Sequence, residues 1–104
     1  MTLSITTRQL ADGSVEISPR GEVDASNAAE IRQAVEAVLA GTAPGRIRLN
    51  LSGVTLLDSA GIGVLVACHG AAAEHRTMFV ITNPSPIIHR QLRVSGIAAL
   101  VGQP

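Results

Sequence analysis

Residues 56–65 read Leu-Leu-Asp-Ser-Ala-Gly-Ile-Gly-Val-Leu, and this stretch decides the fold of the chain. An apolar run from Ile47 to Leu57 precedes it, and a helix is expected to begin just beyond, at about Ser59. A hydroxyl there lies near the unpaired N–H groups of the helix start, at the positive end of the helix dipole. Ser59 can therefore cap the helix, attack a substrate or accept a phosphate, and the local residues leave all three roles open.

The composition excludes several function classes. The chain has 104 residues, 46% of them hydrophobic, which fits one globular domain spanning residues 1–104. Its arginines balance its acidic residues to a net charge of zero, so we expect no nucleic-acid partner. A single cysteine forms no internal disulfide, and no thiol pair suggests a metal site. With no charged-then-apolar leader and no long apolar run, we expect a cytoplasmic protein without membrane insertion.

Two strands and a helix are predicted before the central stretch. Leu3 to Leu10 and Val15 to Ser18 alternate in polarity around a turn at residues 11–14, which predicts an antiparallel pair. Pro19 lacks a ladder donor and suggests an edge position or a bulge.

The helix that follows has several candidate caps. Asp24, Ser26 and Asn27 are all good N-cap residues, and Asn27 stands at capping-box spacing from Glu30. Gly41 is expected to end the helix in the left-handed conformation.

The second half alternates strands and helices. Alternation at Ile47, Leu49 and Leu51 predicts one strand, followed by a strongly apolar helix over about 59–75. Residues 77–82 predict a central strand, and Ser85 with Pro86 starts a third helix. Residues 97–101 form a last strand or a helical turn.

This order of elements predicts an α/β fold, with a mixed, mostly parallel sheet of four to five strands and helices mainly on one face. Asp24 and Ser59 both follow strands and precede helices. We therefore expect them to meet at one end of the domain.

The chain resembles a known family at these residues. Asp58-Ser59-Ala60-Gly61-Ile62-Gly63-Val64-Leu65, with Gly21-Glu22-Val23-Asp24 upstream, is similar to the STAS domain of bacterial anti-sigma factor antagonists. The likeness covers nearly the whole chain in length, element order and motif placement, and implies a single STAS-like domain.

The resemblance implies a regulatory binding module and not an enzyme. In that family, a serine kinase that is also an anti-sigma factor phosphorylates the serine after the motif aspartate. Only the unphosphorylated antagonist binds this kinase and releases the sigma factor, and a phosphoserine phosphatase can reset the switch. Carried over, the phosphoacceptor is Ser59, no cofactor or metal is bound, and the residues expected to contact the partner are Asp24, Ser26, Asn27, Asp58, Ala60, Gly61, Ile62 and Val66.

One departure keeps an alternative open. Many relatives carry Ser or Thr where this chain has Ala60, and Ala at this position also occurs in STAS subunits of lipid-transporting ABC complexes. The alternative is therefore an accessory subunit that docks on a transporter ATPase, and a structural subunit of a signalling assembly is a third class. A hydrolytic role for Ser59 is disfavoured, because the stretch is not a Gly-x-Ser-x-Gly elbow and no His-plus-acid pairing is evident.

Overall fold

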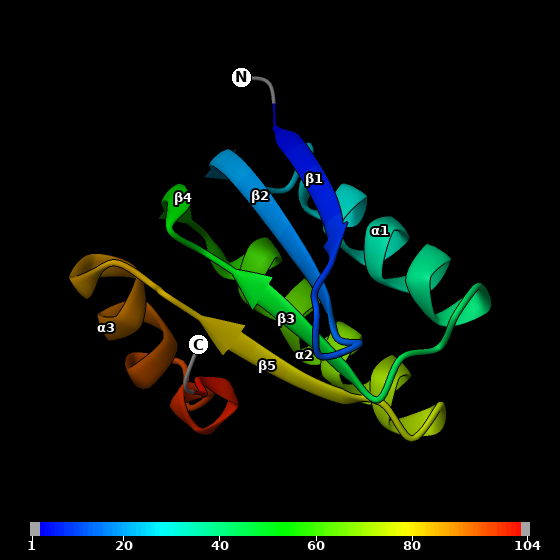
Figure 1. The fold of residues 1–104 in the computed structure, drawn as a ribbon. Coiled ribbons are helices and arrows are strands. Elements are labelled where there is room, and N and C mark those ends of the chain that lie inside the picture. Colours follow the sequence, from blue (N-terminus) through cyan, green and yellow to red (C-terminus); the bar gives the residue numbers. More distant parts are fainter. Residues whose placement is uncertain (1–2, 103–104) are drawn as a thin grey trace.

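The computed structural model describes residues 3–102 as a mixed sheet with helices packed against it (Figure 1). The strands are β1 (Ser4–Gln9), β2 (Val15–Val23), β3 (Arg46–Asn50), β4 (Gly53–Leu57) and β5 (Met78–Thr82). The helices are α1 (Ala28–Ala40), α2 (Ser59–Glu74) and α3 (Pro86–Val94), followed by the 3-10 turn η1 (Ala98–Leu100). The predicted fold class, a single α/β domain with a mixed sheet, is confirmed.

The long strand β2 organises the sheet. It pairs antiparallel with β1 on one side, as predicted. On its other side it pairs parallel with β3 along residues 15–17 and with β4 along residues 20–23. β5 pairs parallel with β3, so the main strand order is β1-β2-β3-β5, with β4 branching from β2.

The strand predicted at Ile47, Leu49 and Leu51 is present as β3, but the predicted order of elements lacks β4, which forms because the chain turns after Asn50. The side chain of Asn50 accepts the backbone N–H of Ser52 at 2.9 Å, and Val54 N–H closes the turn onto the carbonyl of Leu51 at 3.0 Å. A side chain at Gly53 would collide with Arg20 of β2, so only glycine lets the two strands approach this closely. The apolar run therefore forms two strands, β3 and β4, and both pair with β2.

Pro19 lies inside β2, and not at an edge. It falls between the residues that pair with β3 and those that pair with β4, where the strand changes partner. A missing N–H disturbs the ladder least at such a junction. The expected bulge occurs two residues later, between Gly21 and Glu22.

The prediction that residues 77–82 form a central strand is also wrong. β5 pairs with β3 on one side only, and its other edge receives a single bridge from Val101 to Ile81. Phe79 and Ile81 are nevertheless buried, because α2 and η1 pack against β5. Because these elements bury β5, its sequence is as apolar as that of a central strand, and the sequence alone does not distinguish the two cases.

Helices α1 and α2 pack together behind the sheet, whereas α3 lies beside β4 and the end of β5 (Figure 1). The core between the sheet and these helices is aliphatic. Its largest fully buried side chains are Ile17, Val23, Ile31, Val35, Ile47, Leu49, Leu51, Leu57, Leu65, Ile81, Ile88 and Leu92.

Two predicted details of α1 are wrong. Asn27 stands at the N-cap position but forms no side-chain cap, because its amide bonds to the preceding loop. Gly41 follows the helix with φ at −87°, and the left-handed residue of this turn is Ala43, with φ at +42°.

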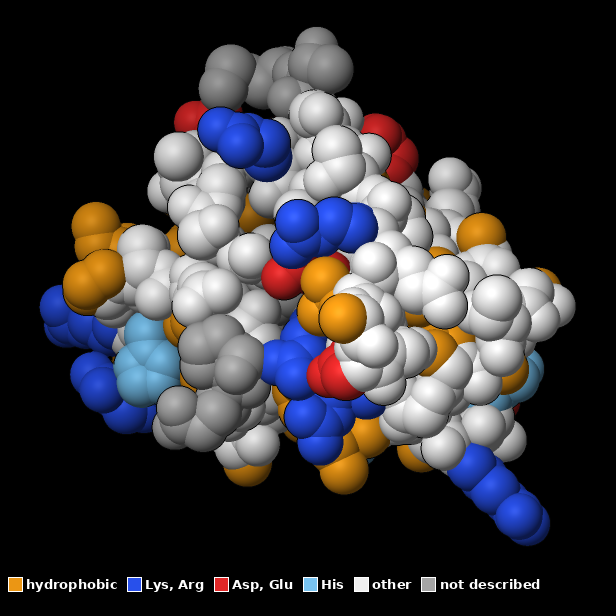
Figure 2. Space-filling view, in the orientation of Figure 1, with side chains coloured by type: hydrophobic (Ala, Val, Ile, Leu, Met, Phe, Trp, Pro, Cys, Tyr) orange, Lys and Arg blue, Asp and Glu red, His pale blue; other side chains and the backbone are white. Residues whose placement is uncertain are grey.

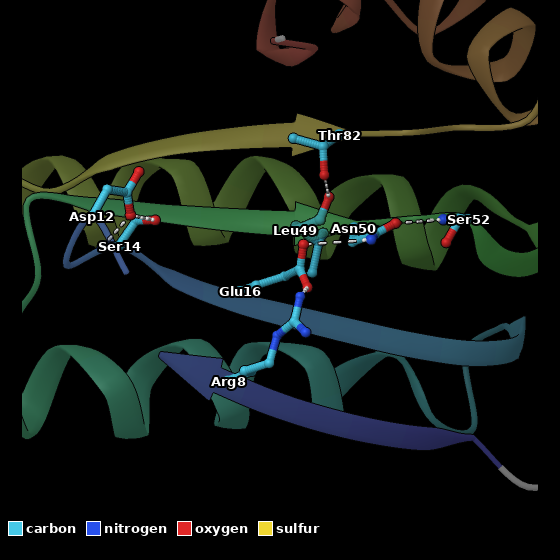
Figure 3. Close-up of polar contacts among 8 residues, drawn as sticks. All are labelled: Arg8, Asp12, Ser14, Glu16, Leu49, Asn50, Ser52 and Thr82. Carbon is cyan, nitrogen blue, oxygen red and sulfur yellow. Dashed lines mark hydrogen bonds and ion pairs between the residues drawn. The ribbon is translucent and has the colours of Figure 1, made fainter. Parts of the chain in front are cut away.

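The sheet face opposite α1 and α2 is polar. Figure 2 shows this face with arginine side chains spread across it. Arg8 pairs with Glu16 at 2.9 Å, and the amide of Asn50 reaches the same carboxylate at 3.5 Å (Figure 3). Arg48 pairs with Asp12 at 3.3 Å. These bonds join β1, β2 and β3 and fix which face of each strand points outward.

Candidate functional site

Two loops lie side by side at the carboxyl ends of β2 and β4. Val23 and Leu57 are the last residues of these strands, and they pair with each other in the parallel register. The backbone N–H of Asp58 donates to the carbonyl of Val23 at 3.2 Å, which ties one loop to the other. The loops that carry Asp24 and Ser59 therefore meet at one end of the domain, as expected from the sequence.

The β2–α1 loop is held by a buried amide. The side chain of Asn27 accepts the backbone N–H of Asp24 and donates to the carbonyl of Glu22, both at 2.9 Å. Asp24 in turn accepts the hydroxyl of Ser26 at 2.6 Å and its N–H at 2.9 Å. These two bonds, the hydroxyl first, hold the pKa of the Asp24 carboxyl below its ordinary value. Asp24 and Ser26 are accessible, whereas Asn27 supports the loop from inside.

Asp58, and not Ser59, caps α2. Its carboxylate accepts the backbone N–H of Gly61 at 3.0 Å, and its carbonyl accepts the N–H of Ile62 at 3.0 Å. Ser59 is the first residue of the helix, and its side chain is exposed. Within residues 3–102, the Ser59 hydroxyl makes no hydrogen bond to the protein. Because another side chain does the capping, this hydroxyl is available to solvent.

Gly61 has a packing role. A Cβ at this position would overlap the side chain of Leu57 and press against Val23, so the first turn of α2 rests directly on the ends of β4 and β2. Gly61 is buried, so it supports the exposed residues around it and offers a partner no side chain.

An apolar stripe continues from Ser59 along the outer face of α2. Ile62 and Val66 follow Ser59 at helical spacing and share its face. Ile62 and Ala60 are half-buried, and Val66 is 49% exposed. This helix is apolar on more than one side, and on this side Ile62 is partly covered whereas Val66 stays exposed.

Helix α3 forms the opposite wall of a groove beside Ser59. The groove has a volume of about 370 Å³ and is lined by Leu57, Asp58, Ser59, Ile62, Ile87, Arg90, Gln91, Val94 and Ser95. Ile87 is 70% exposed and Val94 79% exposed, so the rim is apolar. Arg90 is the one cationic side chain among these lining residues.

The α3 wall was missed in the sequence. Ile87, Ile88 and Leu92 are all apolar residues of α3, but only Ile88 and Leu92 are buried. The available signal was an apolar pair seven residues apart, Ile87 and Val94, with Arg90 between them on the same face.

Other reactive groups do not gather into a site. Among residues 3–102, no group of three His, Cys, Asp or Glu side chains could hold a metal ion. Cys68 is buried in the core, and burial raises the pKa of its thiol to about 11. In the same part of the chain, no helix is long and apolar enough to span a membrane.

Comparisons with known proteins identify the family and the fold. A family model described as "Mlab, STAS domain" matches residues 6–102. An anti-sigma-B factor antagonist of Listeria monocytogenes is 25% identical over 103 residues, which cover 97% of this chain and 88% of that protein.

Solved structures show the same fold at low identity. An anti-sigma factor antagonist from Mycobacterium paratuberculosis matches with a TM-score of 0.83 and 24% identity, over 98% of this chain and 85% of that one. SpoIIAA in its unphosphorylated form matches with a TM-score of 0.82 and 20% identity, over 97% of this chain and 88% of that one. The phosphorylated form of Bacillus SpoIIAA gives a TM-score of 0.74 at 20% identity, over 97% of this chain and 91% of that one.

Proposed function

The chain belongs to the STAS domain family, and from this membership we propose that it is an anti-sigma factor antagonist switched by phosphorylation of Ser59. The observation that carries the proposal is the exposed Ser59 hydroxyl at the start of α2, beside an apolar groove and without a hydrogen bond from the described residues. The solved relative SpoIIAA exists in both phosphorylated and unphosphorylated forms, which supports the same chemistry here.

In the proposed switch, the chain is a kinase substrate and performs no catalysis. The partner, an anti-sigma factor serine kinase in the cytoplasm, transfers the γ-phosphoryl group of ATP to Oγ of Ser59. The serine loses its hydroxyl proton and ADP leaves. A phosphoserine phosphatase would restore the hydroxyl by hydrolysis.

The unphosphorylated surface offers the partner both polar and apolar contacts. Asp24, Ser26 and Asp58 provide polar groups, and Ala60, Ile62 and Val66 provide an apolar stripe. A phosphate on Ser59 adds about −1.5 to −2 charges in the middle of this surface. A loss of ~4 kcal/mol from desolvating that charge would weaken binding about a thousandfold.

The fold should tolerate the phosphate. The start of α2 favours an anion by about 0.3–1 kcal/mol through its dipole and free N–H groups. The carboxylate of Asp58 opposes it by like-charge repulsion. We therefore expect the phosphorylated chain to keep its fold and to differ at its surface.

Two substitutions at Ser59 test the proposal. Ser59→Asp is expected to abolish binding to the anti-sigma factor kinase, and Ser59→Ala to preserve it while preventing phosphorylation. Binding is measured by calorimetry, and the modified residue is mapped by mass spectrometry after incubation with the kinase and ATP. Ser52→Asp is the matched control, since Ser52 is exposed in the β3–β4 turn outside the groove. Equal affinities for the two Ser59 variants would contradict the switch.

Ala60 favours a second candidate, an accessory subunit that docks on the ATPase of a lipid-transporting ABC complex. Such docking would use the same face of α2 without a phosphorylation step. If the purified chain bound a transporter ATPase equally well with Ser59→Asp and Ser59→Ala, and bound no anti-sigma factor, this candidate would replace the first.

A further inference from the structure

Arg90 and Ser59 face the same groove from opposite walls. Ser59 stands at the first position of α2, and Arg90 lies in the middle of α3, on the face that also carries Ile87 and Val94. Arg90 is exposed, and within residues 3–102 it forms no ion pair. Its guanidinium is therefore uncommitted, in contrast to those of Arg8 and Arg48 on the sheet face.

A phosphate on Ser59 would lack full compensation from its own helix. Two N–H groups of the first turn, those of Gly61 and Ile62, already bond to Asp58. The Asp58 carboxylate also brings a negative charge to the residue next to the phosphate. Among the residues that line the groove, the cation that could compensate the phosphate is Arg90.

We propose that Arg90 binds the phosphate of phosphorylated Ser59 across the groove, and that this ion pair closes the docking surface between α2 and α3. A planar guanidinium donates two parallel N–H bonds to phosphate oxygens, which gives a stronger pair than a point charge would. The inference rests on the proposed phosphorylation of Ser59 and adds to it a residue on another helix.

The ion pair would change the groove in two ways. The phosphate and guanidinium would occupy the space between Ile62 and Ile87, where a partner's apolar side chain would otherwise enter. The pair would also hold α3 against α2, because Arg90 belongs to one helix and Ser59 to the other. Phosphorylation would then prevent partner binding in two ways, by filling the groove and by adding negative charge beside it.

A titration of the phosphate tests the pairing without any partner protein. Phosphoserine is placed at position 59 of the full chain by genetic code expansion, and the second ionisation of the phosphate is followed by ³¹P NMR. Arg90→Gln is expected to raise the midpoint by roughly 0.5 pH unit or more, because a nearby cation favours the dianion. Adding salt to about 1 M should shrink this difference, since the pair is solvent-accessible.

Arg93→Gln is the matched control. Arg93 is exposed on the same helix but does not line the groove, so its loss should leave the midpoint unchanged. As a second readout, the methyl resonances of Ile87 should shift on phosphorylation in the unsubstituted chain, and less with Arg90→Gln. Identical midpoints for the unsubstituted chain and Arg90→Gln would overturn the pairing, as would equal shifts for both arginine variants.

The failure of this pairing and the failure of the proposed function are distinguishable. If the Ser59 variants bind the anti-sigma factor differently while Arg90→Gln leaves the midpoint unchanged, the switch stands and the ion pair is wrong. If no kinase modifies Ser59 but the midpoint moves as expected, the pairing stands and the proposed function is wrong.

Discussion

Ser59 owes its free hydroxyl to its neighbour Asp58. Both residue types are good helix caps, and the sequence alone could not decide which would serve. The structure gives the cap to Asp58, whose carboxylate takes the N–H of Gly61. If Ser59 capped α2, the helix would begin one residue later and the Ser59 hydroxyl would be bonded to the backbone. Because the helix begins at Ser59, the cap is Asp58 and the Ser59 hydroxyl is left exposed.

Asp24 should make stability depend on pH. Its folded-state pKa lies below the ordinary value of 3.8 because Ser26 donates two hydrogen bonds to the carboxylate. The ionised carboxylate therefore stabilises the fold fully at pH values above the pKa of Asp24 in the unfolded chain. This stabilisation is lost as the pH falls through the pKa of Asp24 in the folded protein. Urea unfolding at a series of pH values from 6 to 2.5 should show that the free energy of unfolding decreases once the pH drops below about 4.

The matched variant is Asp24→Asn, which keeps an acceptor oxygen for Ser26 and cannot ionise. It should show a smaller loss of stability over the same acid range. Parallel curves for the two proteins would mean that the Asp24 carboxylate does not contribute to the acid dependence. Asp12, whose pKa is also lowered by bonds from Ser14, accounts for part of the remaining slope.

Helix α2 carries two nearby glycines with opposite environments. A Cβ at Gly61 would overlap the side chain of Leu57, whereas a Cβ at Gly63 would meet no atom within 4 Å. Gly61→Ala is therefore expected to cost about 1–3 kcal/mol through overpacking. Gly63→Ala should stabilise the protein by about 0.5–1 kcal/mol, because alanine favours the helix more than glycine does.

Chemical denaturation of the two alanine variants measures this difference directly. Both substitutions add the same methyl group to the same helix, so helix propensity cancels in the comparison. Similar free energies of unfolding would show that α2 can move away from β4 and β2 without cost.

The errors at the level of elements have physical causes. Asn50 to Gly53 carries turn residues, but the apolar alternation on both sides hid the turn inside a strand pattern. β5 has the same apolar sequence that a central strand would have, because α2 and η1 bury it. Local pattern indicates that a residue is buried, but it does not identify which element covers it.

At the scale of the whole molecule, the class and order of the elements followed from the sequence, whereas the groove did not. The alternating strands and helices predicted the α/β fold and placed Asp24 near Ser59. The groove depends on how α3 packs beside β4, a contact between segments about thirty residues apart in the chain. The spacing of Ile87 and Val94 indicates an apolar face on α3, but it does not indicate that this face borders a groove with Ser59.

Cys68 reports on the integrity of the core. Cys68 belongs to the buried side of α2, and its thiol has a pKa of about 11, so the thiolate is scarce at pH 8. Reaction with a thiol reagent should be at least ~100-fold slower in the folded protein than in urea. With a chromogenic disulfide reagent, the absorbance of the thiolate that the reaction releases gives the rate in the folded protein and in urea. Comparable rates would indicate frequent opening of the core around α2.

The branching of the sheet at Pro19 has a mechanical consequence. β3 is bonded on both sides, to β2 and β5, whereas β4 is bonded to β2 alone. Displacing β4 breaks its row of hydrogen bonds with β2, whereas the pairings β1–β2, β2–β3 and β3–β5 remain. Since α3 packs against β4 and Ser59 lies just after β4, we expect a force applied to α3 to move the β4–α2 loop more than the other strands.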